Sequence, residues 1–213
     1  MEHKSIYPYS PLEEKINVYS HAFGAILAFV ALILFIFKAA REGTHLDTIS
    51  NIIFSVSMII LYWVSAKYHN ETNAKKRFKF RIFDHSAIYI LIAGTYTPYA
   101  LSVIKGVDGW ILFGIAWGLA LVGITLKVFF TGRFNIVSTF MYLFMGWIII
   151  FYIKPIVAGM SEEGFSWLLM GGVSYSVGAI IYSIKKIPLN HATFHVFVLL
   201  GSFCHFISIY LFV

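Results

Sequence analysis

Residues 191–213 read HATFHVFVLLGSFCHFISIYLFV, a stretch without Asp, Glu, Lys or Arg. A helix of roughly 20 apolar residues is long enough to cross the hydrocarbon core of a bilayer. The stretch therefore predicts a transmembrane helix. Its histidines are the features to explain, because ionisable groups inside a membrane span are rare and are functional candidates by default.

Six further stretches lack these charged residues and are each long enough to span, which gives predicted spans at 16–37, 48–66, 86–104, 109–126, 134–153, 164–184 and 191–213. The short connections between them carry nearly all the charge, so we expect one seven-helix membrane domain, residues 1–213. The first stretch is too long for a signal peptide and lacks a small-residue cleavage site. Pro98 is expected to kink the third span.

Composition agrees with an all-α integral membrane protein. Hydrophobic residues make up 59% of the chain and charged residues 12%, whereas soluble domains are about half apolar and about a quarter charged. Cys204 is the only cysteine, which excludes an internal disulfide and a cysteine-based zinc or iron–sulfur site. The formal charge of +6 is typical of positive loops on the inner side of a membrane, so no nucleic acid is expected as a partner. No haem or nucleotide site is indicated.

The distribution of Lys and Arg predicts the orientation. With seven spans, twelve of the 16 Lys and Arg residues lie on the side of the N-terminus and of the second, fourth and sixth loops. Because positive residues are retained in the cytoplasm, we expect a cytoplasmic N-terminus and an external C-terminus. The basic loop 67–81 either fixes this topology or also contacts anionic headgroups.

Histidines and a carboxylate recur near the predicted cytoplasmic ends of three helices. His191 and His195 are spaced i, i+4, which places both imidazoles on one helix face and is a known metal-chelating arrangement. Ser65 and His69 repeat this spacing at the end of the second span, and Asp84 stands just before the third. The topology brings these residues to one depth, so three histidines and one carboxylate indicate a zinc site.

Other histidines are weaker candidates for the same site. His21 and His85 lie at the same depth. Each either competes as a metal ligand or forms a hydrogen bond to a ligand without binding the metal itself. His205 faces nearly the same way as His191 but lies roughly 20 Å deeper, too far to share the ion. Each membrane histidine also has a packing interpretation, and Ser65 alone is typical of a helix-packing serine.

Two acidic residues precede the first span. Glu13 and Glu14 are either solvated or cap the first helix.

An ordered series of short motifs resembles the hemolysin III branch of the progestin and adiponectin receptor (PAQR) family over nearly the whole chain. The motifs are Glu13-Glu14-x-x-Asn17-x-x-Ser20-His21, Ser65-x-x-x-His69, Asp84-His85-x-x-Ile88-Tyr89, Ala93-Gly94-Thr95-Tyr96-Thr97-Pro98, Met145-Gly146-Trp147, Tyr175-x-x-Gly178 and His191-x-x-x-His195 with Gly201-Ser202 and His205. Each is weak alone, but their order is specific.

The resemblance implies seven helices, a cytoplasmic N-terminus and an intramembrane zinc near that side. Three histidines bind the zinc in the relatives, and they match His69, His191 and His195. Asp84 matches an acidic residue that reaches the zinc through water, and Ser65 matches a serine of the same motif. We expect a bacterial member in the cell (plasma) membrane, with membrane lipids as partners. The sequence does not determine the oligomeric state.

Three histidines leave one position on zinc open, as in catalytic rather than structural sites. The leading hypothesis is a zinc-dependent, ceramidase-like hydrolase of lipid amides or esters, or a lipid sensor that adjusts membrane state. Asp84 would orient or deprotonate water, and Ser65 would polarise the carbonyl. One alternative is a channel-forming hemolysin that causes cytolysis. Another is a receptor-like or structural protein with a structural zinc.

Overall fold

In the computed structural model, which describes residues 9–42, 44–131 and 135–213, all regular elements are helical. They are α1 (Pro11–Glu42), α2 (His45–Asn70), α3 (Ala74–Pro98), η1 (Tyr99–Ile104), α4 (Gly106–Phe130), α5 (Asn135–Gly146), η2 (Ile148–Tyr152), α6 (Ile153–Gly159), α7 (Glu162–Ser183) and α8 (Asn190–Phe212). Among the described residues, seven helical segments are long and apolar enough to cross a membrane. The predicted fold class of seven transmembrane helices is thereby confirmed.

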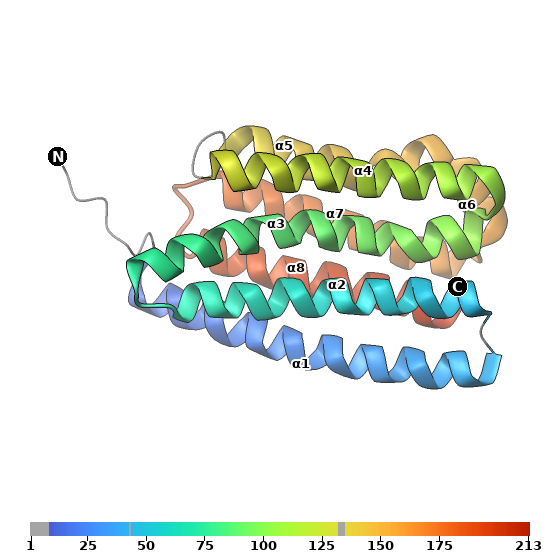
Figure 1. Ribbon diagram of the computed structural model, residues 1–213, viewed down its shortest axis with the longest axis horizontal. Coiled ribbons are helices and arrows are strands. Elements are labelled where there is room, and N and C mark those ends of the chain that lie inside the picture. Colours follow the sequence, from blue (N-terminus) through green and yellow to red (C-terminus); the bar gives the residue numbers. More distant parts are fainter. Residues whose placement is uncertain (1–8, 43, 132–134) are drawn as a thin grey trace.

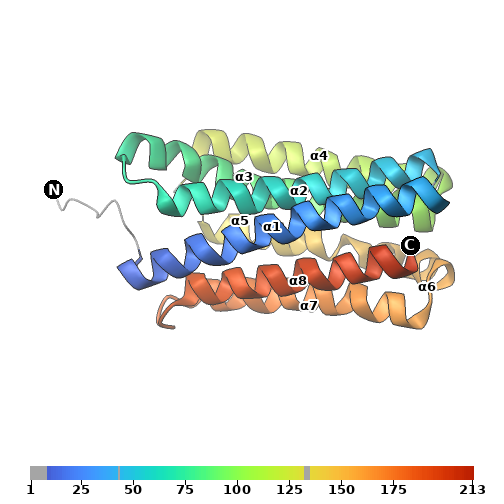
Figure 2. The ribbon, with the colours of Figure 1, turned by 90° about the horizontal axis from the view of Figure 1, so that it is seen from below.

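The helices run lengthwise in one bundle, and the N-terminal end of α1 lies at the same end as the starts of α3 and α8 (Figure 1). Helix α1 packs on α2 and α8, and α7 packs on α8 (Figure 2). The third span, which consists of α3 and η1, is the most deeply buried of the seven, whereas α1 lies at the outside of the bundle. The outer helices expose large apolar side chains, as a lipid-facing surface requires. Which side faces the cytoplasm stays a prediction.

Local sequence signals set where several helices begin. The Thr44 hydroxyl accepts a hydrogen bond from the Asp47 backbone N–H, and the Thr44 N–H donates to the Asp47 carboxylate. This capping box supplies partners for N–H groups that the first turn of α2 leaves free. The Asn73 side chain accepts from two N–H groups of α3, and Ser161 caps α7. These polar caps lie between the apolar segments and fix their ends.

The third span changes its type of helix at Pro98, and the kink expected there stays a prediction. The α-helix ends at Pro98 and continues as the π-helical turn η1, because proline has no N–H to donate within the helix. The Ala100 carbonyl that closes this segment accepts from Lys105 N–H at 3.0 Å. Gly109 of α4 lies directly against Ala100, so the next helix starts close to the π-helical segment.

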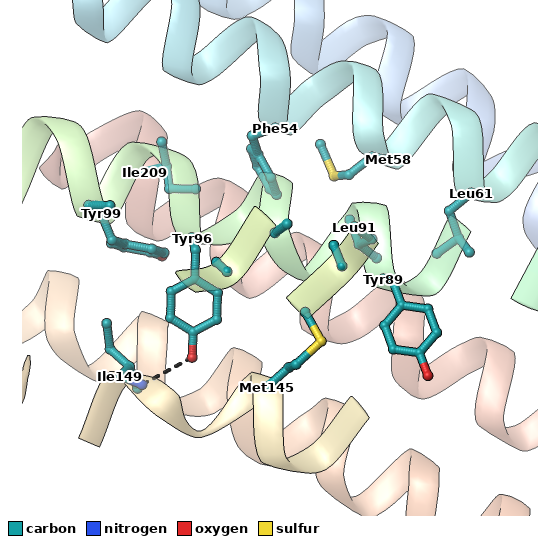
Figure 3. Close-up of a cluster of buried hydrophobic side chains, with 14 of the residues drawn as sticks. Phe54, Met58, Leu61, Tyr89, Leu91, Tyr96, Tyr99, Met145, Ile149 and Ile209 are labelled. Carbon is teal, nitrogen blue, oxygen red and sulfur yellow. Dashed lines mark hydrogen bonds between the residues drawn. The ribbon is translucent and has the colours of Figure 1, made fainter. Parts of the chain in front are cut away.

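The fifth span is not one continuous α-helix. It consists of α5, the 3₁₀ turn η2 and α6, so backbone groups near Gly146 lack ordinary helical partners. The Tyr96 hydroxyl donates to the Gly146 carbonyl at 2.8 Å and accepts from Ile149 N–H at 3.1 Å (Figure 3). Irregular backbone at membrane depth requires such partners, because lipid provides none. The central helix α3 thereby supports the break.

Small residues bring α7 and α8 together. A Cβ at Gly171 would lie 2.6 Å from the His205 ring, and one at Gly178 would lie 2.8 Å from Phe197. The close approach of membrane helices commonly depends on such small residues. Gly171 and Gly178 therefore allow α7 and α8 to pack closely.

Candidate metal centre

Three histidines converge at the end of the bundle where α2 finishes and α8 begins. His191 Nε2 lies 3.1 Å from His69 Nε2 and 3.1 Å from His195 Nε2. One ring nitrogen from each histidine lies within 4.8 Å of the others, and all three residues are buried. The three residues that the sequence predicts as ligands can therefore hold one metal ion.

The two separations of 3.1 Å are close to the value for two nitrogens on one ion. With Zn–N bonds of about 2.0–2.1 Å, for example, two ligand nitrogens on a tetrahedral ion are separated by about 3.3 Å. Metal-binding histidines also usually donate their second ring N–H to an outer partner, which fixes the tautomer. Each of the three rings has such a partner at Nδ1, which orients its Nε2 lone pair inwards.

The partner of His69 is Glu14, whose carboxylate accepts from Nδ1 at 2.7 Å. The other carboxylate oxygen of Glu14 pairs with Arg77, which is itself buried and donates to the His69 carbonyl at 3.2 Å. Glu14 is therefore neither solvated nor a cap of the first helix, the two alternatives that the sequence left open. It is held inside the bundle because α1 packs against α2, where the imidazole and the guanidinium offset its desolvation.

Glu13 also acts away from its own helix. Its carboxylate accepts from the backbone N–H of His191 at 3.0 Å and of Ala192 at 3.4 Å. Helix α8 needs this contact, because Leu189 before it has a left-handed conformation (φ 54°) and gives no side-chain cap. A carboxylate at a helix N-terminus is stabilising. Glu13 therefore caps α8, and α1 holds both ligand-bearing helices at the cluster.

Tyr9 and Ser20 are the outer partners of the other two ligands. The Tyr9 hydroxyl lies 3.2 Å from His191 Nδ1, and the two rings are stacked with centroids 4.4 Å apart. Burial raises the pKa of Tyr9, so its hydroxyl is protonated at neutral pH. Ser20 Oγ lies 3.4 Å from His195 Nδ1.

His21 is close to the cluster but does not join it. Its ring is stacked on His195 with a centroid distance of 3.5 Å and an interplanar angle of 3°. Both ring nitrogens are buried and lack a hydrogen-bond partner among the described residues. His21 therefore supports one face of the His195 imidazole.

A cavity of about 230 Å³ starts at the histidines. Asp84, Ser65 and His85 line it together with His191 and His195. Asp84 is buried but lies outside the three-histidine cluster. Ser65 lies beside the Asp84 carboxylate without hydrogen-bond geometry, and its buried hydroxyl has no other partner among the described residues. The two predicted polar residues thus face the same space as the histidines.

His205 lines the far part of this cavity. Its Nδ1 lies 3.3 Å from the Tyr99 hydroxyl. The prediction that it lies too deep to share the ion agrees with its absence from the cluster among the described residues.

The sequence reasoning missed the outer partners of the ligands. Glu14 and His69 are 55 residues apart, so their contact depends on helix packing. A signal did exist: Glu14, Asn17 and His21 are spaced i, i+3 and i+7, which places them on one face of α1. A polar stripe at the start of an apolar helix indicates a face turned towards a buried polar site.

The chain is similar to known proteins over most of its length. The family model described as Haemolysin-III related matches residues 9–206. The chain is 48% identical over 197 residues to the Hemolysin-3 homolog of Bacillus subtilis, covering 92% of each chain. It is 46% identical over 201 residues to Hemolysin-3 of Bacillus cereus, covering 94% of this chain and 92% of that one.

A distant human relative is also similar along most of the chain. The Monocyte to macrophage differentiation factor is 26% identical over 209 residues, covering 93% of this chain and 83% of its own. The seven membrane helices and these relatives indicate a multi-pass protein, consistent with the cell membrane. The chain belongs to the Haemolysin-III-related family, the hemolysin III branch of the PAQR family.

Proposed function

We propose that this protein is a zinc-dependent hydrolase of membrane lipid amides or esters. The observation that carries the proposal is the position of three converging histidine nitrogens at one end of a largely apolar cavity that also contains Asp84 and Ser65. His69, His191 and His195 would hold the zinc. Bound zinc polarises a carbonyl oxygen and makes a coordinated water more acidic.

The neighbouring side chains supply proton transfer and polarity. Asp84, as a carboxylate, orients a water molecule beside the histidines and accepts its proton. The Ser65 hydroxyl donates a hydrogen bond to the carbonyl oxygen as negative charge develops there. Its lack of another partner among the described residues supports this role. Glu14, Tyr9 and Ser20 orient the imidazoles and do not contact the substrate.

The shape of the cavity supports a lipid substrate. Its lining extends along α8 from His191 to His205, which is about 20 Å at 1.5 Å per residue. One leaflet is about 15 Å thick, so an acyl chain fits this length. Ile150, Ile153 and Leu169 line the cavity and are also exposed on the outer surface of the bundle. A lipid can therefore enter sideways from the bilayer near these residues.

A lipid panel tests the proposal. Zinc-loaded protein in detergent is incubated with N-acyl amides and acyl esters, and released fatty acid is measured by mass spectrometry. Asp84→Asn should lower kcat by about 10²–10⁴-fold, the usual contribution of a general base, at unchanged zinc content. Asp108→Asn, at an exposed carboxylate at the other end of the bundle, is the matched control. No product from any lipid at full zinc content would contradict the hydrolase and favour a structural metal.

The name of the Bacillus cereus relative, Hemolysin-3, favours a second candidate function, lysis of cells. Purified protein would then release haemoglobin from erythrocytes. Lysis that persists in the His191→Ala/His195→Ala variant would support this function and separate it from the metal centre. The absence of lysis at all protein concentrations would exclude this second candidate function.

A further inference from the structure

Lys127 is a buried cation that the proposed chemistry does not use. It lies in the last turn of α4, only 4% of it is exposed, and it lines the same cavity as the histidines. A lysine near the end of a membrane helix usually extends its ammonium group to the interface. Here the side chain is held inside the bundle.

The packing of α4 explains this position. Gly123 lies one turn before Lys127 on the same helix face, and the Tyr89 ring packs directly against it. The Tyr89 and Tyr142 rings lie 4.5 Å apart, and Lys127 Nζ lies 6.0 Å from the centre of the Tyr142 ring. The missing side chain at Gly123 allows α4 to approach α3, so Lys127 points into the cavity.

The protein leaves this charge without a full partner. Lys127 forms no ion pair with a carboxylate of any described residue. Its contact with the Tyr142 ring is at the outer limit of cation–π distances, and such a contact offsets only part of the desolvation of a buried ammonium. An anion in the cavity would complete the interaction.

The surroundings fit a phosphate group. His85 Nδ1 is buried and has no hydrogen-bond partner among the described residues, and His85 lines the cavity with Ser138 and Thr139. The last turn of α4 lies at the end of the bundle (Figure 1). A helix of 25 residues is about 37 Å long and exceeds the hydrocarbon core of about 30 Å, so we place this turn close to the lipid headgroups. A lysine binds phosphate as a point charge.

We propose that Lys127 binds the phosphate of an anionic lipid whose acyl chain lies in the cavity. This lipid site rests on one part of the proposed function, namely that a lipid enters the cavity beside the histidines. It assigns the substrate or regulatory lipid to the anionic phospholipids and places the headgroup between α3, α4 and α5.

Native mass spectrometry of the detergent-purified chain tests the site with dioleoylphosphatidylglycerol and dioleoylphosphatidylcholine at equal concentration. The parent should retain more phosphatidylglycerol. Lys127→Met should reduce that preference by about tenfold, the loss of one charge-assisted hydrogen bond, and Lys127→Arg should keep most of it. Lys75→Met, at an exposed basic residue near the start of α3, should leave it unchanged. Equal binding of both lipids by the parent, or an undiminished preference in Lys127→Met, would overturn the proposal.

Two further measurements distinguish a lipid site from a site for a free anion, and a failed lipid site from a failed hydrolase. Millimolar inorganic phosphate should not displace phosphatidylglycerol, and displacement would assign the site to a free anion instead. The metal-free His191→Ala/His195→Ala variant should keep the lipid preference, so a failed hydrolase and a failed lipid site give different results. If Lys127→Met does not fold, the preference for phosphatidylglycerol over phosphatidylcholine is compared between the parent and Lys127→Arg. A parent without this preference would still overturn the proposal.

Discussion

Replacing Glu14 by Gln tests how α1 supports the metal centre. The substitution keeps the shape of the side chain but removes the negative charge that accepts the Nδ1 hydrogen of His69 at 2.7 Å. Loss of an outer partner of a metal-binding histidine typically lowers metal affinity 10–100-fold. That range corresponds to about 1.4–2.8 kcal/mol. We therefore expect zinc affinity to fall by this amount in a competition titration against a fluorescent chelator.

The same substitution also leaves the buried Arg77 without its carboxylate. Breaking a buried ion pair destabilises by about 3–5 kcal/mol, and the remaining bonds of Arg77 to the carbonyls of His69 and Glu71 reduce this amount. The Glu14→Gln/Arg77→Met variant separates the loss of zinc affinity from the loss of stability, because it also removes the unpaired guanidinium charge of Arg77. Its thermal stability without metal should recover, while its zinc affinity should stay low.

Glu163→Gln is the control, because Glu163 is an exposed carboxylate in the first turn of α7 at the opposite end of the bundle. It should change neither zinc affinity nor thermal stability. A folded Glu14→Gln protein that binds zinc as tightly as the parent would refute the reasoning. The short contact between Glu14 and His69 would then be a packing contact without influence on the ligand.

The remaining predictions concern metal and packing. Elemental analysis should find about one zinc per chain in the parent and a background level in the His191→Ala/His195→Ala variant. Chelation should lower the thermal midpoint of the parent, by the equivalent of about 2.7 kcal/mol if free zinc was 100 times Kd, and should leave that variant unchanged. Gly171→Ala should destabilise by about 1–3 kcal/mol through overpacking, because the new Cβ would lie 2.6 Å from the His205 ring. Gly172→Ala, with nothing within 4 Å, should be neutral or slightly stabilising; equal midpoints for the two glycine variants would contradict the packing argument.

The sequence by itself determined the membrane helices and the three histidines that can hold a metal ion. A bilayer forces each apolar stretch to satisfy its backbone within a helix, so charge-free length alone predicted seven spans. The i, i+4 spacing of His191 and His195 placed both rings on one face, and the alternating direction of the spans brought His69 to their depth. These inferences needed only the geometry of single helices and the order in which they cross.

The tertiary structure alone decided what surrounds those ligands. Glu13 caps a helix that begins 178 residues later, and Lys127 turns inward because Gly123 allows α4 to approach Tyr89. Such contacts depend on how each helix is rotated about its axis, and one residue of difference turns a side chain by about 100°. Apolar helices carry little sequence information about that rotation, since lipid and protein interior are similarly apolar. Packing between the helices therefore decides the partners of the histidines and the shape of the cavity.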